Sequence, residues 1–220
     1  MSLKARSIFI LIYLLCVFSV VGFYTSAYSA DWRVYTENGG MNVTERDVSE
    51  GHKSYHLIGL ESSIENMRAK VKGGVEGWFR GEPADEDPEI PQMGAGAFAE
   101  YAYKLKWGMP YLGVRYDHIA RDVPPKYEND SQFEDTLDMF SATGGVHFKY
   151  KWMWADIGTI IPFYTSTKSG NFGPDLGIGF TWKNFDVGYR FKEIRLTDHH
   201  FQGGEAFSIY WSGCEIGYSF

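Results

Sequence analysis

Two segments of the chain gather residues that could carry out proton transfer. Residues 85–87 read Asp-Glu-Asp, and residues 198–200 read Asp-His-His. Carboxylates and imidazoles are common general acids and bases, so a site where the two segments meet could serve an enzyme. Acidic doublets are also frequent in proline-rich surface loops, and two adjacent histidines alone make a weak metal site. We therefore predict solvated loops here, with no catalytic residue, no metal and no cofactor.

The first 30 residues differ in character from the rest of the chain. Lys4 and Arg6 precede the apolar run IFILIYLLCVFSVVGF, and small residues follow it. This order is typical of a secretory signal peptide, and the run is short for a membrane-spanning helix, which needs about 20 residues. We expect residues 1–30 to be a signal peptide cleaved after Ala30, with Ala27 and Ser29 as alternative sites, and residues 31–220 to form one mature domain.

The composition of residues 31–220 excludes several classes of protein. This part carries 19 basic and 28 acidic residues, so we expect no nucleic-acid partner. Its single cysteine, Cys214, cannot form an intramolecular disulfide. The whole chain is 17% aromatic and contains 25 glycines, which is unusual for a soluble domain and suits a barrel with an aromatic-rich outer band.

Apolar side chains recur at every second position after residue 31, and this period indicates strands with one apolar and one polar face. The runs are roughly 11–14 residues long, enough for a tilted strand to cross a hydrocarbon core. Closed bacterial barrels use even numbers of strands. We predict an all-β, closed antiparallel up-and-down transmembrane barrel of ten strands, or eight if short strands are merged or discarded. The predicted strands are 53–63, 67–80, 94–107, 111–123, 136–150, 153–166, 173–183, 185–197 and 205–220, with residues 31–47 supplying a tenth that is interrupted near Gly39 and Gly40.

Short and long connections alternate along the chain. Residues 107–110, 151–154 and 183–186 form short turns, whereas 81–93, 122–135, 165–173 and 197–204 are longer and polar. In outer-membrane barrels the short turns are periplasmic and the long loops extracellular. Aromatic rings gather near the short turns, as expected at a membrane–water interface. The predicted interface aromatics are Trp107, Tyr111, Tyr150, Trp152, Trp154, Trp182, Tyr218 and Phe220.

The chain ends in SIYWSGCEIGYSF, where apolar residues alternate back from the terminal phenylalanine. In this motif the chain resembles the small β-barrel proteins of Gram-negative outer membranes, in the size class of OmpA- and OmpX-like and omptin-like barrels. The resemblance implies a bacterial outer-membrane location, outer-membrane lipid and lipopolysaccharide as surroundings, a monomer, and periplasmic chaperones and the barrel-insertion machinery as partners during biogenesis. The implied insertion signal consists of Tyr210, Cys214, Ile216, Tyr218 and Phe220.

The opposite faces of the predicted strands point into a narrow lumen that side chains should fill. Charges of both signs in a confined space are expected to pair. We predict a lumen closed by an ion network of Arg68, Lys70, Lys72, Glu76, Glu100, Lys104, Arg115, Asp117, Arg190, Lys192 and Glu215, with Arg80, Lys149, Asp156 and Asp186 on the same faces.

These patterns predict a structural or surface-interaction role, with an enzyme or a narrow pore for small solutes as alternatives. The two segments at residues 85–87 and 198–200 look like the catalytic arrangement of omptins, the ten-stranded outer-membrane proteases. That resemblance implies that Asp85 and Asp87 hold a water molecule that His200, oriented by Asp198, helps to activate. The lipid A deacylases of this size carry a His-x-Ser pair, which His147 does not begin, since residues 147–149 read His-Phe-Lys. Lipid A modification, by a deacylase or through an acyl-transferase cavity, stays open as an alternative.

Overall fold

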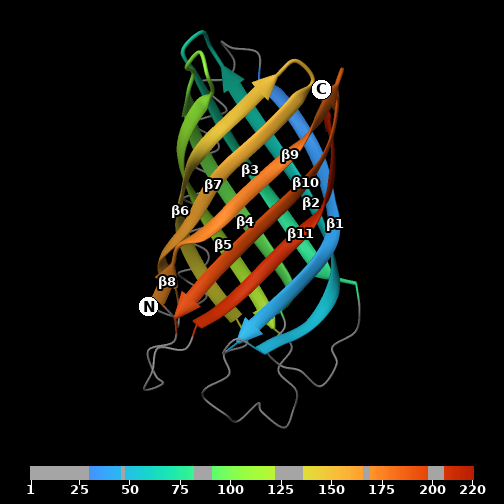
Figure 1. Ribbon diagram of the computed structural model, residues 1–220, viewed down its shortest axis with the longest axis vertical. Coiled ribbons are helices and arrows are strands. Elements are labelled where there is room, and N and C mark those ends of the chain that lie inside the picture. The colour runs from blue at the N-terminus through green and yellow to red at the C-terminus, as the bar shows by residue number, and fades with distance from the viewer. Residues whose placement is uncertain (1–29, 46–47, 82–90, 122–135, 166–168, 198–205) are drawn as a thin grey trace.

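The computed structural model describes residues 30–45, 48–81, 91–121, 136–165, 169–197 and 206–220 (Figure 1). No helix within these residues is long and apolar enough to cross a membrane. Residues 1–29 of the predicted signal peptide lie outside the described residues. The strands are β1 (Asp31–Glu45), β2 (Val48–Glu65), β3 (Ala69–Arg80), β4 (Pro91–Tyr103), β5 (Met109–Arg121), β6 (Thr136–Tyr150), β7 (Met153–Thr165), β8 (Ser169–Asn171), β9 (Gly173–Trp182), β10 (Phe185–Thr197) and β11 (Ala206–Ser219).

The sheet closes on itself, because the last strand, β11, pairs with both β10 and β1. β8 and β9 follow one another along the same side of β10, with Asn171 opposite Arg195 and Asp175 opposite Lys192. They form one barrel strand that is interrupted at Phe172. The fold is therefore a closed ten-stranded antiparallel up-and-down barrel, as the sequence predicts.

The two ends of the barrel differ in their connections. The turns at residues 66–68, 104–108, 151–152 and 183–184 lie with the C-terminus at one end, uppermost in Figure 1, which we call the turn end. The opposite end, which we call the loop end, is where β3, β5 and β10 end, and residues 82–90, 122–135 and 198–205 lie outside the described residues.

The first barrel strand is continuous where the sequence predicts an interruption. β1 pairs with β11 through Gly39 and Gly40 without a break. The glycine at position 39 serves close packing, since an added Cβ would lie 2.0 Å from the carbonyl oxygen of Ser212. The irregularity in this strand is instead a register shift between Asn42 and Val43 in its pairing with β2. The predicted interruption is wrong because this glycine permits close approach and does not end the strand.

Two strand boundaries differ from the predicted ones by four residues or more. β2 begins at Val48 and not at residue 53, because it pairs with β1 through a polar segment that shows no alternation. β4 ends at Tyr103 and not at residue 107, since the alternating pattern continues into the turn. Sequence periodicity locates the strands well, but it does not show at which residue the pairing of a strand starts or stops.

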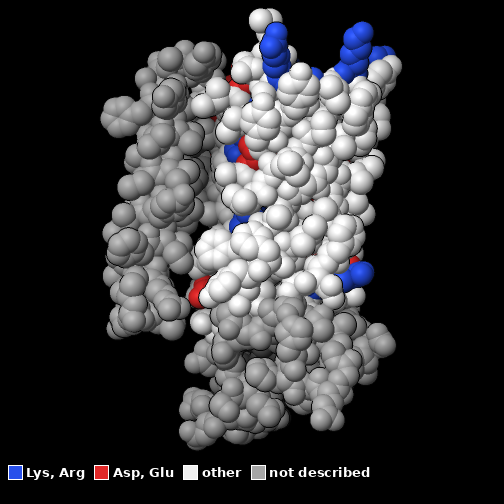
Figure 2. All heavy atoms as spheres, turned by 90° about the vertical axis from the view of Figure 1, so that its left-hand side faces the viewer, with Lys and Arg blue, Asp and Glu red and all other residues white. Residues whose placement is uncertain are grey.

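The outer wall of the barrel is apolar and exposed. Leu112 on β5 is 75% exposed, and Ile157 on β7 and Ile178 on β9 are also exposed on the outer face. Figure 2 shows that the wall over β6 and β7 carries few charged side chains, whereas Lys and Arg stand out at the turn end. An exposed apolar surface that extends along the strands suits hydrocarbon as its surroundings and not water.

Inward-facing glycines make room for inward-facing aromatic rings. The ring of Trp154 lies over Gly177, Gly179 and Gly188, where an added Cβ would lie 2.9, 2.5 and 2.4 Å from ring atoms. The outer aromatic band therefore accounts for only part of the aromatic content. The rings that face the lumen include Tyr35, Tyr55, Trp78, Phe98, Tyr111, Trp154 and Trp211.

Val114→Arg, in the exposed outer row of β5, is expected to lower the free energy of unfolding in a bilayer by about 2–4 kcal/mol, because it places a charge in hydrocarbon. Ala120→Arg, on the same face of β5 but near the loop end, should cost only about 0–1 kcal/mol. Urea unfolding of the protein in phospholipid vesicles measures both values. Equal costs for the two variants would contradict a lipid-facing wall.

Candidate functional site

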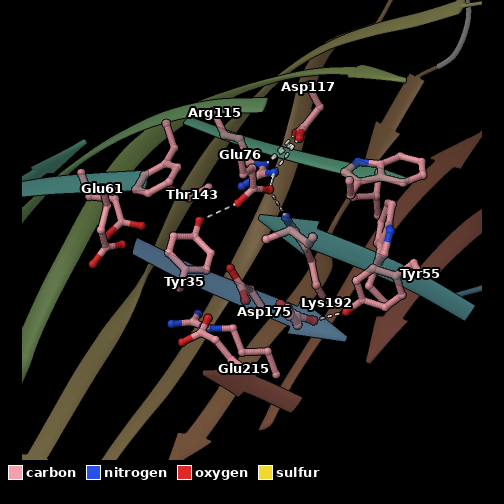
Figure 3. A pocket seen from close by; sticks show the side chains of 18 of the residues that line it. Tyr35, Tyr55, Glu61, Glu76, Arg115, Asp117, Thr143, Asp175, Lys192 and Glu215 are labelled. Atoms are coloured by element: carbon pink, nitrogen blue, oxygen red, sulfur yellow. Dashed lines mark hydrogen bonds and ion pairs between the residues drawn. The ribbon is translucent and has the colours of Figure 1, made fainter. Parts of the chain in front are cut away.

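Side chains from four strands meet around a buried arginine in the lumen. Arg115 on β5 donates from Nε and Nη2 to the carboxylate of Asp117, at 2.8 and 2.6 Å, and from Nη2 to Glu76 on β3. Glu76 also accepts a hydrogen bond from the Tyr35 hydroxyl at 3.0 Å and lies 3.5 Å from Nζ of Lys192 (Figure 3). Two cations thus neutralise two carboxylates, which avoids the cost of an isolated buried charge.

A second cluster joins the strands at which the barrel closes. Glu215 on β11 accepts hydrogen bonds from Arg33 on β1 and from Arg190 on β10, both at 2.6 Å. Arg33 also donates to Asp186 at 2.9 Å, and Arg190 donates to Asp156 at 3.2 Å. The carboxylate of Glu215 therefore holds β10, β11 and β1 together from inside the lumen.

Asp156 continues the network toward β6 and β4. Nδ1 of His147 lies 2.7 Å from Asp156, and its Nε2 lies 3.4 Å from Glu100, which pairs with Lys72 at 2.9 Å. The imidazole stacks on the Tyr111 ring with 4.2 Å between centroids. Because each ring nitrogen faces a carboxylate, the histidine donates to both only when it carries two protons. The network therefore runs without a break from Arg33 to Lys72.

The loop-end half of the lumen is lined mainly by apolar side chains, although Arg80 at the end of β3 is also buried there. The rings of Trp78 on β3 and Trp211 on β11 meet edge to face with their centroids 6.1 Å apart. Alternation alone did not predict this apolar layer, although the inward positions near the loop end of several strands are apolar in the sequence. The layer consists of Met41, Tyr55, Leu57, Trp78, Ile119, Leu137, Met139, Ile194, Leu196, Ile209 and Trp211.

Described residues in the ionic half of the lumen line at least two cavities. One, of about 90 Å³, lies between the ion network and the apolar layer, and Thr143, Trp78 and Trp211 line it. The other, of about 340 Å³, is lined by residues toward the turn end such as Lys70 and Lys149. Arg33, Lys72 and Arg190 line both cavities. Among the described residues, no three His, Cys, Asp or Glu side chains are placed to hold a metal ion.

Most of the charged residues predicted for the lumen lie there, but two do not. Arg68 is exposed in the turn at residues 66–68, and Lys104 follows the end of β4, where it pairs with Glu65 and donates to the carbonyl oxygen of Asn66 at 2.6 Å. Both predictions are wrong because the strands end earlier than the alternation suggests. Lys70 lines the larger cavity, and the inward position of Arg80 is buried.

Six of the eight predicted interface aromatics are exposed at the turn end, and two face the lumen. Tyr111 is only 6% exposed and stacks on His147, while Trp154 lies with its ring 5.3 Å from the guanidinium of Arg190. Their prediction as interface residues is wrong, because their parity in the strand places them on the same face as Arg115 and Asp156. The exposed residues are Trp107, Tyr150, Trp152, Trp182, Tyr218 and Phe220.

The other predicted residues divide between outward-facing and undescribed ones. Cys214, Ile216, Tyr218 and Phe220 are exposed at alternate positions at the end of the chain, and the half-buried Tyr210 has the same parity. Their role as an insertion signal stays a prediction. Asp85, Asp87, Asp198 and His200 lie outside the described residues.

Arg115→Met is expected to lower the free energy of unfolding by about 3–5 kcal/mol, because it leaves Glu76 and Asp117 buried without their main cation. Lys104→Met, which breaks the half-exposed pair with Glu65, should cost about 0–1 kcal/mol. Chemical unfolding in detergent micelles gives both values. A cost for Arg115→Met as small as that for Lys104→Met would show that the buried cluster contributes little.

Comparisons with known proteins identify the fold. No protein-family model and no curated protein sequence matches the chain. Among solved structures, the outer membrane protease OmpT from Escherichia coli matches with a TM-score of 0.51 and 8% identity, over 87% of this chain and 96% of that one. An outer-membrane channel from Pseudomonas putida F1 matches with a TM-score of 0.48 and 8% identity, over 88% and 96%. Neisserial surface protein A matches with a TM-score of 0.38 and 12% identity, over 87% and 99%. The chain thus has the closed up-and-down β-barrel fold of small bacterial outer-membrane proteins.

Proposed function

We propose that this protein is an integral outer-membrane barrel with a closed lumen, which acts as a structural element or a surface-interaction scaffold. The observation that carries this proposal is the two-layer filling of the lumen, with paired charges toward the turn end and packed apolar side chains toward the loop end. A barrel filled in this way offers its outer wall and its two ends for function, and not a passage.

The apolar outer wall supports the membrane location. Exposed apolar residues such as Leu112, Ile157 and Ile178 belong to different strands, so the apolar surface extends around the barrel. Exposed aromatic rings lie near the turn end, where the wall would meet the membrane–water interface. Both features are typical of a barrel in a bilayer.

The apolar layer supports the closed lumen. Met41, Met139 and Leu196 are fully buried within it, which supports an apolar constriction of the lumen at this level. Ions cross apolar constrictions poorly because such constrictions lose their water. The larger cavity toward the turn end favours a narrow pore as the second candidate function. The apolar layer is the feature that favours a closed barrel over that pore.

The closure of the barrel supports a monomer. β1 and β11 pair along their length, so these strands offer no free edge to another copy. Protein partners during biogenesis, lipopolysaccharide contacts and any enzymatic activity of the loops remain predictions, and the residues proposed for catalysis lie outside the described part of the chain.

Planar-bilayer recording of the wild-type protein is expected to show no discrete conductance steps. Trp78→Ala combined with Trp211→Ala should produce such steps, because it removes two rings from the layer that closes the lumen. Leu112→Ala combined with Val114→Ala, on the outer wall, should stay silent and serves as the control. Regular conductance steps from the wild-type protein would contradict a closed lumen and favour the narrow pore.

A further inference from the structure

The turn end of the barrel carries one exposed basic side chain on each of its four short turns. These are Arg68, Lys106, Lys151 and Lys183, which we call the basic collar. The four turns follow one another around the closed sheet, so the collar surrounds the barrel. Figure 2 shows Lys and Arg standing out at this end above a wall with few charges. The collar contrasts with the chain as a whole, whose net charge is −7.

The collar cations are not part of the ion network in the lumen. None of the four forms an ion pair with a carboxylate among the residues that the structure describes, whereas Lys104 beside them is paired with Glu65. At the same end Asp186 is held inward by Arg33 and Thr181, which leaves Asp31 as an exposed carboxylate. The rim of the barrel therefore presents unneutralised positive charge.

Two collar lysines occupy a backbone conformation that favours glycine or asparagine. Lys151 has φ 55° and Lys183 has φ 54°, each at the first position of a two-residue turn. A non-glycine residue in this left-handed region is uncommon, and hairpins of this kind prefer Asn or Gly there. The same exception occurs in two separate turns. Such an outlier points to a function for the side chain.

Three of the four collar cations, Lys106, Lys151 and Lys183, lie next to exposed aromatic residues of their own turns. Nζ of Lys151 lies 5.4 Å from the ring centroid of Tyr150, and Nζ of Lys183 lies 5.1 Å from that of Trp182. Lys106 directly precedes the exposed Trp107. These rings mark the depth of the membrane–water interface, where lipid phosphates lie. The ammonium groups are thus placed at phosphate depth.

We propose that the basic collar binds the headgroups of anionic phospholipids, such as phosphatidylglycerol, in the periplasmic leaflet. This inference rests on the proposed membrane location of the barrel. The phosphodiester of an anionic lipid has no cationic group beside it, so it complements an unpaired lysine ammonium. The phosphate of a zwitterionic lipid is already neutralised by the cationic group of its own headgroup. A basic cluster next to a membrane surface attracts anionic lipid, and salt screens this attraction.

Competition between spin-labelled phosphatidylglycerol and phosphatidylcholine at the surface of the folded, bilayer-reconstituted protein tests this assignment. The wild-type protein should prefer the anionic lipid by roughly five-fold for each ammonium group in contact, and molar salt should reduce the preference. Lys106→Gln with Lys151→Gln and Lys183→Gln should abolish most of it. The corresponding triple Lys→Arg variant should retain it, because it keeps the charges at the same backbone positions.

The outcomes separate this inference from the proposed function. A wild-type preference near one, or an equal preference in the triple Gln variant, overturns the collar as a lipid site while the barrel remains inserted. Lysine-dependent co-sedimentation with isolated peptidoglycan, together with no lipid preference, overturns it in favour of the cell-wall polymer. Failure of the wild-type protein to insert into either bilayer overturns the membrane location itself. Should the triple Gln variant not fold, Lys106→Gln alone and the salt titration of the wild-type protein still give the test.

Discussion

The pairing of β1 with β11 is the constraint on which the rest of the structure depends. A strand in hydrocarbon has no water to satisfy its backbone N–H and C=O groups, so a transmembrane sheet must close. The backbone of Phe220 exchanges hydrogen bonds with Trp32 at 2.9 and 3.2 Å, so the closure extends to the last residue. The terminal phenylalanine therefore completes a ladder of backbone hydrogen bonds and also places an exposed ring at the turn end.

Closure with ten strands leaves a narrow lumen, and the lumen residues reflect this lack of space. Large rings such as Trp154 face inward only where the neighbouring strands carry glycine. Charges face inward only with partners, as Glu215 does between Arg33 and Arg190. Toward the loop end most inward residues are apolar, although Arg80 is also buried there. Size and charge are therefore matched across strands, which is what a close-packed interior requires.

The two ends of the barrel differ in their connections and in the side chains that they carry. At the turn end the connections are as short as two residues, and three of the four short turns carry a basic residue next to an exposed aromatic residue. The carbonyl oxygen of Trp152 accepts a hydrogen bond from the backbone N–H of Thr181 at 2.7 Å, so this turn is tied to the next barrel strand. A rigid end of this kind suits contact with a membrane surface. The apolar layer lies toward the other end of the lumen.

Period-2 alternation located nine of the ten barrel strands and indicated which side of each faces outward, whereas the tenth was predicted only from the even strand number of closed bacterial barrels. Alternation could do this because it is a local property of an extended chain in contact with two different environments. It also placed Arg115, Asp117 and Glu215 inside. The pairings themselves could not be derived, since Arg33 and Glu215 are 182 positions apart and Arg115 and Glu76 are 39 apart.

Only the tertiary structure decided these pairings, together with the inward positions of Tyr111 and Trp154, the turn positions of Arg68 and Lys104, and the apolar layer. The stagger between neighbouring strands sets which residues share a level of the lumen. That stagger is a property of the closed sheet and not of any single strand.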